Sequence, residues 1–267
     1  MMKKLLILTF LVLLGAQALA FSPYENRMRF EDRQRIGLIA FVKPSQTQKL
    51  QSLVSKVSQH DAKLSQQGIF NLSMYVREVN NRAVVFAYFE SLDKSIQGKE
   101  ALLANASPEL ANLTKYLTPH KRAAKGQVWL RMEWMNLIAS TEVFPHTQPN
   151  VQKMGLMSGL KPELELQYRQ LHQANWPGVV DGMVNSNYRN WTTFLIELEG
   201  ELYLFTYTEY IGENIKKDNA KMAKDPTTQR WWQHTEQCLI NLHGEGNWSQ
   251  MTQITTPITT SGLEGKK

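Results

Sequence analysis

The chain contains 267 residues, of which 42% are hydrophobic and 20% are charged, and it carries a formal net charge of +6. Its basic residues are mostly interleaved with acidic ones, which argues against a nucleic-acid partner. Cys238 is the only cysteine, so a hydrophobic core must stabilise the fold without a disulfide, and the length allows one large domain or two small ones.

The first residues have the pattern of a secretory signal. Two lysines precede an apolar run at residues 5–14, and Ala18-Leu19-Ala20 is the small-x-small sequence that signal peptidase reads. The apolar run is shorter than the about 20 residues that a membrane span needs. We therefore expect a signal peptide over residues 1–20, export to the periplasm or the extracellular space, and no membrane partner after cleavage. An uncleaved N-terminal anchor is the alternative.

An internal repeat relates the two halves of the chain. The offset of 119 positions that superposes Phe86 on Phe205 also superposes Glu90 on Glu209. Further pairs at this offset are Asn71 with Asn190, Glu78 with Glu197, Tyr88 with Tyr207, Ala101 with Ala220, Trp129 with Trp248, and Met132 with Met251. The shared offset predicts a tandem duplication. The expected parts are two copies at residues 35–139 and 153–258, a linker at 140–152 and a flexible tail at 259–267.

Each copy has the same predicted order of elements, and the strand expected at 36–42 matches one at 154–160. Apolar runs, prolines and a Glu-Gly turn delimit these elements. In the second copy they are, in chain order, a strand at 154–160, a helix that contains Tyr168 and breaks near Trp176-Pro177, strands at 188–198 and 201–210 joined by a turn at Glu199-Gly200, a helical region at 213–240 interrupted near Asp225-Pro226, and a strand that starts near Trp248.

This β-α-β-β-α-β order is that of a ferredoxin-like unit. Such a unit has helices on only one face of its sheet, so the other face needs a cover. Two units packed sheet to sheet meet this need within one chain. We therefore expect an α+β fold, an intrachain dimeric α/β barrel of two ferredoxin-like units, and a monomer in solution.

The two copies differ in the residues that carry chemistry. The pair Trp231-Trp232 matches Asn112-Leu113 in the first copy, and Trp191 matches Leu72. The first copy has kept residues that form the fold and lacks the unusual ones. We therefore expect a degenerate scaffold in the first copy and an active unit in the second.

Aromatic residues gather in the second copy. Tyr168, His172 and Trp176 stand at i, i+4 and i+8, which places them on one face of a helix; a core stripe with a satisfied histidine is the alternative. Trp191 and Trp231-Trp232 extend this set to an aromatic pocket, and aromatic faces pack well on the C–H face of a sugar ring. Adjacent helical residues lie about 100° apart, so two neighbouring indoles need an apolar partner besides the core. A cleft would provide it.

These residues resemble the L-rhamnose mutarotase family over about residues 154–255. The elements that carry the resemblance are Tyr168-x3-His172-x3-Trp176-Pro177, Asn190-Trp191, Phe205-x-Tyr207-x-Glu209, Gln229-Arg230-Trp231-Trp232 and Trp248-x2-Met251. The resemblance implies a dimeric α/β barrel that interconverts the α and β anomers of a deoxysugar without a cofactor. It also implies that His172 is the acid/base, and that Tyr168, Trp231 and Trp232 contact the sugar. The family usually has a tyrosine where this chain has Trp191, which removes a hydroxyl from the pocket.

We therefore predict His172 and Tyr168 as catalytic residues. Ring opening needs a proton delivered to the ring oxygen and another removed from the anomeric hydroxyl, and a histidine with its ordinary pKa of about 6.5 suits this exchange. We expect no cofactor and no metal, because the histidines of this copy lack the spacing of a zinc site. The residues expected to bind the monosaccharide are Trp231, Trp232, Trp191, Trp176 and Asn190.

Two other functions remain open from the sequence. A non-catalytic sugar-binding module would use the same pocket. A different enzyme class on this barrel, such as a small oxygenase acting on haem or a polyketide, is the other alternative, and with haem His172 would be an axial ligand. Cys238 is expected to be a small apolar residue of the core. Glu90 and Glu209 occupy matching positions in the two copies, so we expect these residues to have a role in strand geometry and not in catalysis.

Overall fold

A computed structural model describes the protein over residues 33–57, 62–91, 98–139 and 151–255. The expected signal peptide at 1–20, the tail at 259–267 and all but the last two residues of the expected linker lie outside these ranges. Within them, no helix has both the length and the hydropathy of a membrane span.

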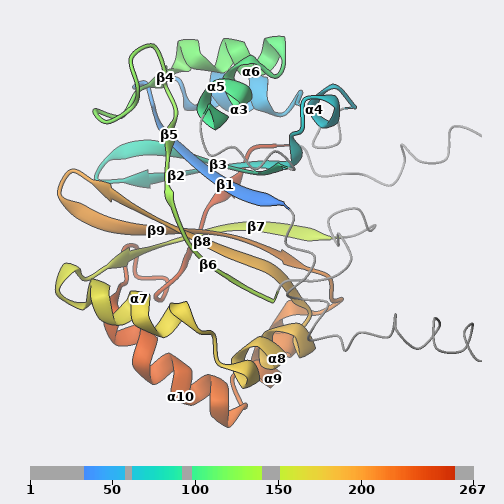
Figure 1. Ribbon diagram of the computed structural model, residues 1–267, viewed down its shortest axis with the longest axis vertical. Helices are drawn as coiled ribbons and strands as arrows, with labels where there is room; N and C mark the ends of the chain where they lie inside the picture. The colour runs from blue at the N-terminus through green and yellow to red at the C-terminus, as the bar shows by residue number, and fades with distance from the viewer. Residues whose placement is uncertain (1–32, 58–61, 92–97, 140–150, 256–267) are drawn as a thin grey trace, which may run out of the picture.

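Two antiparallel sheets lie face to face in the middle of the molecule, and helices cover the outer face of each sheet (Figure 1). The first unit forms most of one sheet and the helices that cover it. Its elements are β1 (Gln34–Val42), α3 (Thr47–Val54), α4 (Ala62–Gln66), β2 (Phe70–Val79), β3 (Arg82–Ser91), α5 (Lys99–Asn105), α6 (Pro108–Leu113), a 3-10 turn (Thr114–Tyr116), β4 (Leu117–Thr118), β5 (Leu130–Arg131) and β6 (Glu133–Ile138).

The second unit repeats this order. Its elements are β7 (Gln152–Leu160), a 3-10 turn (Pro162–Leu164), α7 (Glu165–Gln173), α8 (Pro177–Asn185), β8 (Tyr188–Leu198), β9 (Glu201–Tyr210), α9 (Ile215–Met222), α10 (Pro226–Thr235), a 3-10 turn (Glu236–Cys238), β10 (Leu239–Ile240), β11 (Ser249–Gln250) and β12 (Thr252–Gln253). The ferredoxin-like order expected from the sequence is therefore confirmed in both units. The expected helical region at 213–240 ends earlier, because its last residues form β10.

Local sequence explains where several elements begin. Pro226 occupies the first turn of α10, where its missing N–H costs nothing, and the preceding Asp225 accepts a hydrogen bond from the Thr228 amide at 2.7 Å. The turn between β8 and β9 places Glu199 and Gly200 at φ values of 57° and 91°. A two-residue hairpin loop in which both residues have positive φ has the twist that matches the right-handed twist of the two flanking strands.

The last strand of each unit crosses to the sheet of the other unit. Strand β5 pairs with β1 of its own unit, and after Met132 the chain continues as β6, which pairs with β8 of the second unit. Strand β11 pairs with β7, and after Met251 the chain continues as β12, which pairs with β2 of the first unit. The two sheets thus run β12-β2-β3-β1-β4 and β6-β8-β9-β7-β10. This equal topology agrees with a tandem duplication, which stays a prediction.

Aromatic residues fill the space between the sheets, and glycines make room for them. A Cβ on Gly37 of β1 would lie 2.7 Å from Cγ of Phe194 in the facing sheet, and a Cβ on Gly155 of β7 would meet the Tyr75 ring. Phe194 and Tyr75 are both fully buried. Each first strand therefore needs glycine where a ring of the other unit packs against it.

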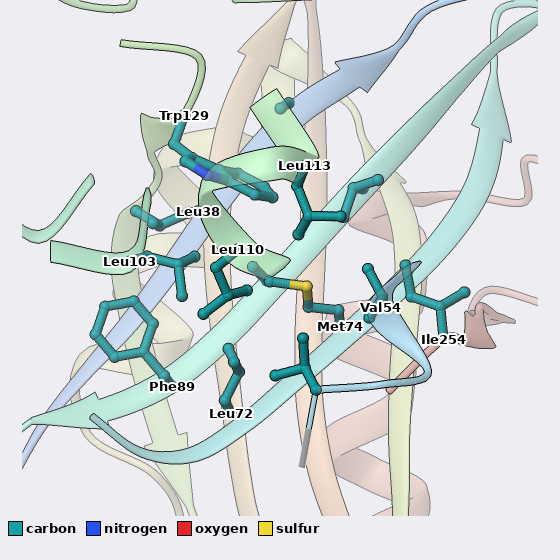
Figure 2. Packing of buried hydrophobic residues seen from close by; sticks show 14 of the residues in the cluster. Leu38, Val54, Leu72, Met74, Phe89, Leu103, Leu110, Leu113, Trp129 and Ile254 are labelled. Carbon is teal, nitrogen blue, oxygen red and sulfur yellow. The ribbon is translucent and has the colours of Figure 1, made fainter. Parts of the chain in front are cut away.

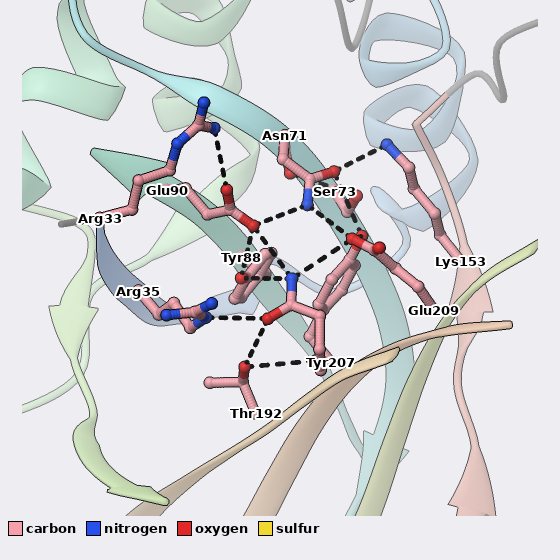
Figure 3. Close-up of polar contacts among 11 residues, drawn as sticks. Arg33, Arg35, Asn71, Ser73, Tyr88, Glu90, Lys153, Thr192, Tyr207 and Glu209 are labelled. Carbon is pink, nitrogen blue, oxygen red and sulfur yellow. Dashed lines mark hydrogen bonds and ion pairs between the residues drawn. The ribbon is translucent and has the colours of Figure 1, made fainter. Parts of the chain in front are cut away.

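A polar cluster lies at one end of this interface (Figure 3). The Asn71 amide nitrogen donates to the carboxylates of Glu90 and Glu209 at 3.0 Å each. The Asn190 amide nitrogen donates to the same two carboxylates at 3.0 and 3.3 Å. Positive charge comes from Arg33, which pairs with Glu90 at 3.1 Å. The two buried carboxylates therefore link the units, a role beyond the strand geometry expected from the sequence.

Candidate active site

A cavity of about 280 Å³ lies between the second sheet and its helices. Strands β8 and β10, helices α7 to α10 and the loop before β11 all contribute to its wall. The first unit contributes as well, because Ile138 at the end of the crossing strand β6 lines it. The lining residues are Ile138, Tyr168, His172, Val179, Met183, Trp191, Met222, Thr228, Trp231, Trp232, Thr235, Glu236, Leu239, Asn247 and Trp248.

The two adjacent indoles both face this cavity from α10. Thr228, Trp231, Trp232 and Thr235 stand at i, i+3, i+4 and i+7, so they form one stripe along the helix. Trp231 is buried with 5% of its surface exposed, and Trp232 is partly buried. The two neighbouring indoles therefore face a cavity, as expected from their need for an apolar partner besides the core.

His172 is fixed in one tautomer by its own helix. Its Nδ1 lies 2.8 Å from the Tyr168 carbonyl oxygen, which can only accept a hydrogen bond, so Nδ1 carries the proton. Nε2 of the neutral ring is then the unprotonated nitrogen that a ligand can meet. The imidazole lies edge to face with Trp231 at 5.1 Å between ring centroids.

Burial lowers the pKa of His172 to about 4, although the hydrogen bond to the Tyr168 carbonyl raises it in part. A buried imidazole loses the hydration of its charged form, so the neutral form is favoured. The ordinary value of about 6.5 expected from the sequence is therefore wrong for this site. At neutral pH the ring is uncharged, with Nε2 as a hydrogen-bond acceptor and a weaker base than a free imidazole.

Tyr168 lies beside His172, with 4.1 Å between the ring centroids. Only 2% of its surface is exposed, and it packs with Leu160, Leu204 and Cys238. Burial raises the pKa of its phenol. The hydroxyl therefore stays protonated at neutral pH, and Tyr168 forms part of the wall of the cavity.

Trp176 does not share the helical face expected from the i+8 spacing. Helix α7 ends at Gln173, and Trp176 has an extended backbone directly before Pro177 at the start of α8. It is not among the lining residues of the cavity. Its ring instead packs behind Trp231, with 5.3 Å between centroids, and the Arg230 guanidinium lies 5.3 Å from it. Trp176 therefore supports an indole of the site from outside.

Asn190 and Trp191 lie on opposite faces of β8, because successive residues of a strand point to opposite sides. Trp191 lines the cavity and meets Trp248 edge to face at 5.8 Å. Asn190 points into the space between the sheets, where its amide is bonded to Glu90 and Glu209. The sugar contact expected for Asn190 is thus replaced by a contact between the units.

Several lining residues were missed in the sequence. Thr228 and Thr235 could have been found from their spacing around Trp231, three residues before it and four after it. Ile138 has no such signal, because only the crossing of β6 brings it to the second unit. Among residues 33–57, 62–91, 98–139 and 151–255, no group of three or more His, Cys, Asp or Glu side chains could hold a metal ion.

Apolar side chains fill the matching space in the first unit (Figure 2). Leu72 takes the position of Trp191, Leu113 that of Trp232, and Trp129 that of Trp248, and each of these three is at most 1% exposed. Val54 packs in the same cluster, near the position of His172. The first unit therefore has core packing where the second has a cavity.

The second unit, which contains most of this cavity, matches known proteins in sequence. Residues 153–256 match the family model described as L-rhamnose mutarotase. An L-rhamnose mutarotase of Leptothrix cholodnii is 27% identical over 88 residues, which cover 33% of this chain and 78% of that protein.

Solved structures with a similar overall arrangement are distant in sequence. A candidate monooxygenase from Lactobacillus acidophilus NCFM has a TM-score of 0.49 and 11% identity, over 83% of this chain and 94% of that chain. An anthrone oxidase-like protein has a TM-score of 0.44 and 12% identity, over 84% of this chain and 91% of that chain. Residues 153–256, which build all of the cavity except Ile138, thus match the L-rhamnose mutarotase family.

Proposed function

We propose that the second unit interconverts the α and β anomers of L-rhamnose or a related 6-deoxy sugar without a cofactor. The observation that carries this proposal is the meeting of His172, Tyr168 and the Trp231-Trp232 pair at one cavity. Its volume of about 280 Å³ is near the lower end of the range for small-ligand sites, which suits a monosaccharide. The family match over residues 153–256 supports a sugar as the ligand.

The reaction needs only proton transfers. In the proposed mechanism, Nε2 of neutral His172 removes the proton of the anomeric hydroxyl while the ring oxygen takes a proton from the Tyr168 hydroxyl or from a water. The bond between the anomeric carbon and the ring oxygen breaks and leaves an aldehyde and a free hydroxyl. The aldehyde rotates, the hydroxyl attacks its other face, and both protons return. No net charge or atom is gained or lost.

The walls of the cavity suit a sugar with one apolar face. Trp191, Trp231 and Trp232 offer aromatic surface for C–H groups. Thr228, Thr235, Glu236 and Asn247 offer hydrogen-bonding groups for hydroxyls. The apolar side also suits the methyl group of a 6-deoxy sugar.

Polarimetry on freshly dissolved single anomers tests the substrate. We expect the purified protein to speed the approach to equilibrium for L-rhamnose or a related deoxysugar above the rate in buffer. Hexoses with a 6-hydroxyl serve as the comparison set, because they would place that hydroxyl against indoles. Rates equal to buffer for every deoxysugar would end the proposal.

A non-catalytic sugar-binding module is the second candidate, favoured by the indole of Trp191 at a wall where a hydroxyl would assist the chemistry. Titration calorimetry with a deoxysugar separates the two: binding without faster anomer exchange supports the module. A haem ligand is disfavoured, because its macrocycle is much larger than a monosaccharide and the cavity measures about 280 Å³.

We also propose that the chain acts after export and as a monomer. The residues that support export are the apolar run and Ala18-Leu19-Ala20 within 1–20. A monomer is supported by the pairing of both sheets within one chain. The mass of the protein recovered from the periplasm or medium tests cleavage, and light scattering tests the oligomeric state.

A further inference from the structure

The helix that carries Tyr168 and His172 is tied to a strand of the first unit by an ion pair. Arg169 of α7 donates from Nη1 and Nη2 to the two carboxylate oxygens of Glu133 on β6, at 2.5 and 2.8 Å. Its Nε donates to Glu165 on its own helix at 2.9 Å. A two-pronged pair of this kind fixes the plane of the guanidinium as well as its distance. The pairing with arginine lowers the pKa of Glu133, so the carboxylate is charged at neutral pH.

A second contact ties the end of α7 to the same strand. Asn175, two residues after the helix, donates from Nδ2 to the Leu137 carbonyl oxygen at 3.0 Å. Strand β6 also places Met135 against the apolar cluster that contains Tyr168, and Ile138 against the cavity. One short strand of the first unit thus holds α7 at two points and forms part of the wall.

Helix α7 depends on contacts of this kind for its orientation. It has nine residues, its N-cap Leu164 makes no capping hydrogen bond, and its C-cap Ala174 has an extended backbone. Helices shorter than about 12 residues are marginal in isolation. Arg169 directly follows Tyr168 and precedes His172 by less than one turn. A small rotation of α7 would therefore move Nε2 of His172 relative to a bound sugar, and proton transfer depends steeply on that geometry.

We propose that Glu133 of the first unit is a positioning residue for the site in the second unit, acting through Arg169 on the orientation of His172. This inference rests on the proposed function. It gives the first unit a role in the site although its own matching space is filled by core residues. The crossing of β6 between the sheets is what makes the contact possible.

The chain offers a matched control for this pair. Arg82 and Glu199 form another ion pair between the units, at 2.6 Å, and neither residue lines the cavity. The Glu133, Arg169, Arg82 and Glu199 side chains are all partly exposed, at 54%, 30%, 42% and 51%. Glu199→Gln therefore removes an ion pair between the units without touching α7.

The experiment compares the kinetics of anomer exchange in Glu133→Gln, Arg169→Gln, the double variant and Glu199→Gln. We expect each of the first two to lower kcat about 5-fold to 10-fold with KM changed less than about 2-fold, since the sugar contacts remain. The double variant should be no worse than Arg169→Gln, because that variant has already lost the contact with Glu133. Glu199→Gln should match the wild type. Equal losses in Glu133→Gln and Glu199→Gln, or an unchanged kcat in Glu133→Gln, would overturn the proposal.

Hydrogen exchange without sugar separates this inference from the proposed function. Peptides that cover residues 165–173 should exchange faster in Glu133→Gln and at the wild-type rate in Glu199→Gln. Unchanged exchange of these peptides in Glu133→Gln would contradict the positioning role. A wild type that does not speed anomer exchange would instead contradict the proposed function, whatever the exchange of α7.

Discussion

Asn71 of the first unit donates a hydrogen bond to Glu209 of the second unit at 3.0 Å. Its counterpart Asn190 donates in the other direction, to Glu90 at 3.0 Å. Both asparagines have positive φ, 54° and 52°, at irregularities in the pairing of β2 and β8 with their neighbours. The rings of Tyr88 and Tyr207, one from each unit, stack with 3.8 Å between their centroids. The units therefore meet through a polar contact that is nearly the same from either side.

Glu209→Gln should lower the free energy of unfolding by about 3 kcal/mol, as measured by urea denaturation. Glu209 is fully buried, and the Asn71 amide and the Tyr207 hydroxyl both donate to it. A glutamine keeps an oxygen for these donors, which meet Oε1, but it removes the charge that the buried amine of Lys153 faces. Glu199→Gln is the control, because the loss of an exposed ion pair should lower the free energy of unfolding by less than about 1 kcal/mol. Equal losses in the two variants would contradict this account of the interface.

The pH dependence of activity should report the lowered pKa of His172. Since that pKa is about 4, the base stays neutral over the whole physiological range. After subtraction of the rate in buffer, kcat/KM should be flat from about pH 8 to about pH 5 and fall to half near the pKa. A half-point near the ordinary histidine value of about 6.5 would show that the imidazole is not desolvated in the working enzyme.

The same shift predicts how stability depends on pH. Between about pH 6.5 and pH 4 the unfolded chain binds a proton at residue 172 and the folded chain does not, so the wild type loses stability as the pH falls. The loss should approach roughly 3 kcal/mol relative to His172→Gln, which has no such proton. Urea denaturation of both proteins at about pH 7 and about pH 4 measures it. A stability difference that is equal at the two pH values would contradict the burial of the imidazole.

Trp232→Ala should weaken sugar binding about 10-fold, because it removes an aromatic wall of the cavity, a loss of roughly 1.4 kcal/mol. Trp134→Ala is the matched control, since Trp134 on β6 is 49% exposed and does not line the cavity. Titration calorimetry with a deoxysugar measures both. Equal affinities of the two variants would place the sugar away from α10.

The strands of the second unit could be read from the sequence because their signals are local. The bounds 188–198 and 201–210 were predicted correctly, since apolar runs and the Glu199-Gly200 turn lie within each segment. The stripe of lining residues on α10 is local in the same way, because Thr228 and Thr235 stand at helical spacing from Trp231. The crossing of β6 to the other sheet has no local signal, because the choice of a pairing partner depends on distant residues.

Two residues expected to bind the sugar, Asn190 and Trp176, do not line the cavity, because their placement depends on the folded chain and not on sequence spacing alone. Asn190 stands beside Trp191 in the sequence, but the alternation of β8 sends their side chains to opposite faces of the sheet. Trp176 has the spacing of a helical face, but α7 ends before it at Gln173 and Pro177 starts a new helix. Burial, which sets the pKa of His172, is likewise a property of the folded chain.

Saturation exchange by NMR between the α and β anomer signals of L-rhamnose at equilibrium tests the central claim most directly. With wild-type protein at neutral pH, we expect an exchange rate well above that of buffer, and with His172→Ala a rate that returns to the buffer value. Trp134→Ala should keep the wild-type rate. An exchange rate equal to that of buffer with the wild type, or equal rates for the wild type and His172→Ala, would contradict the account.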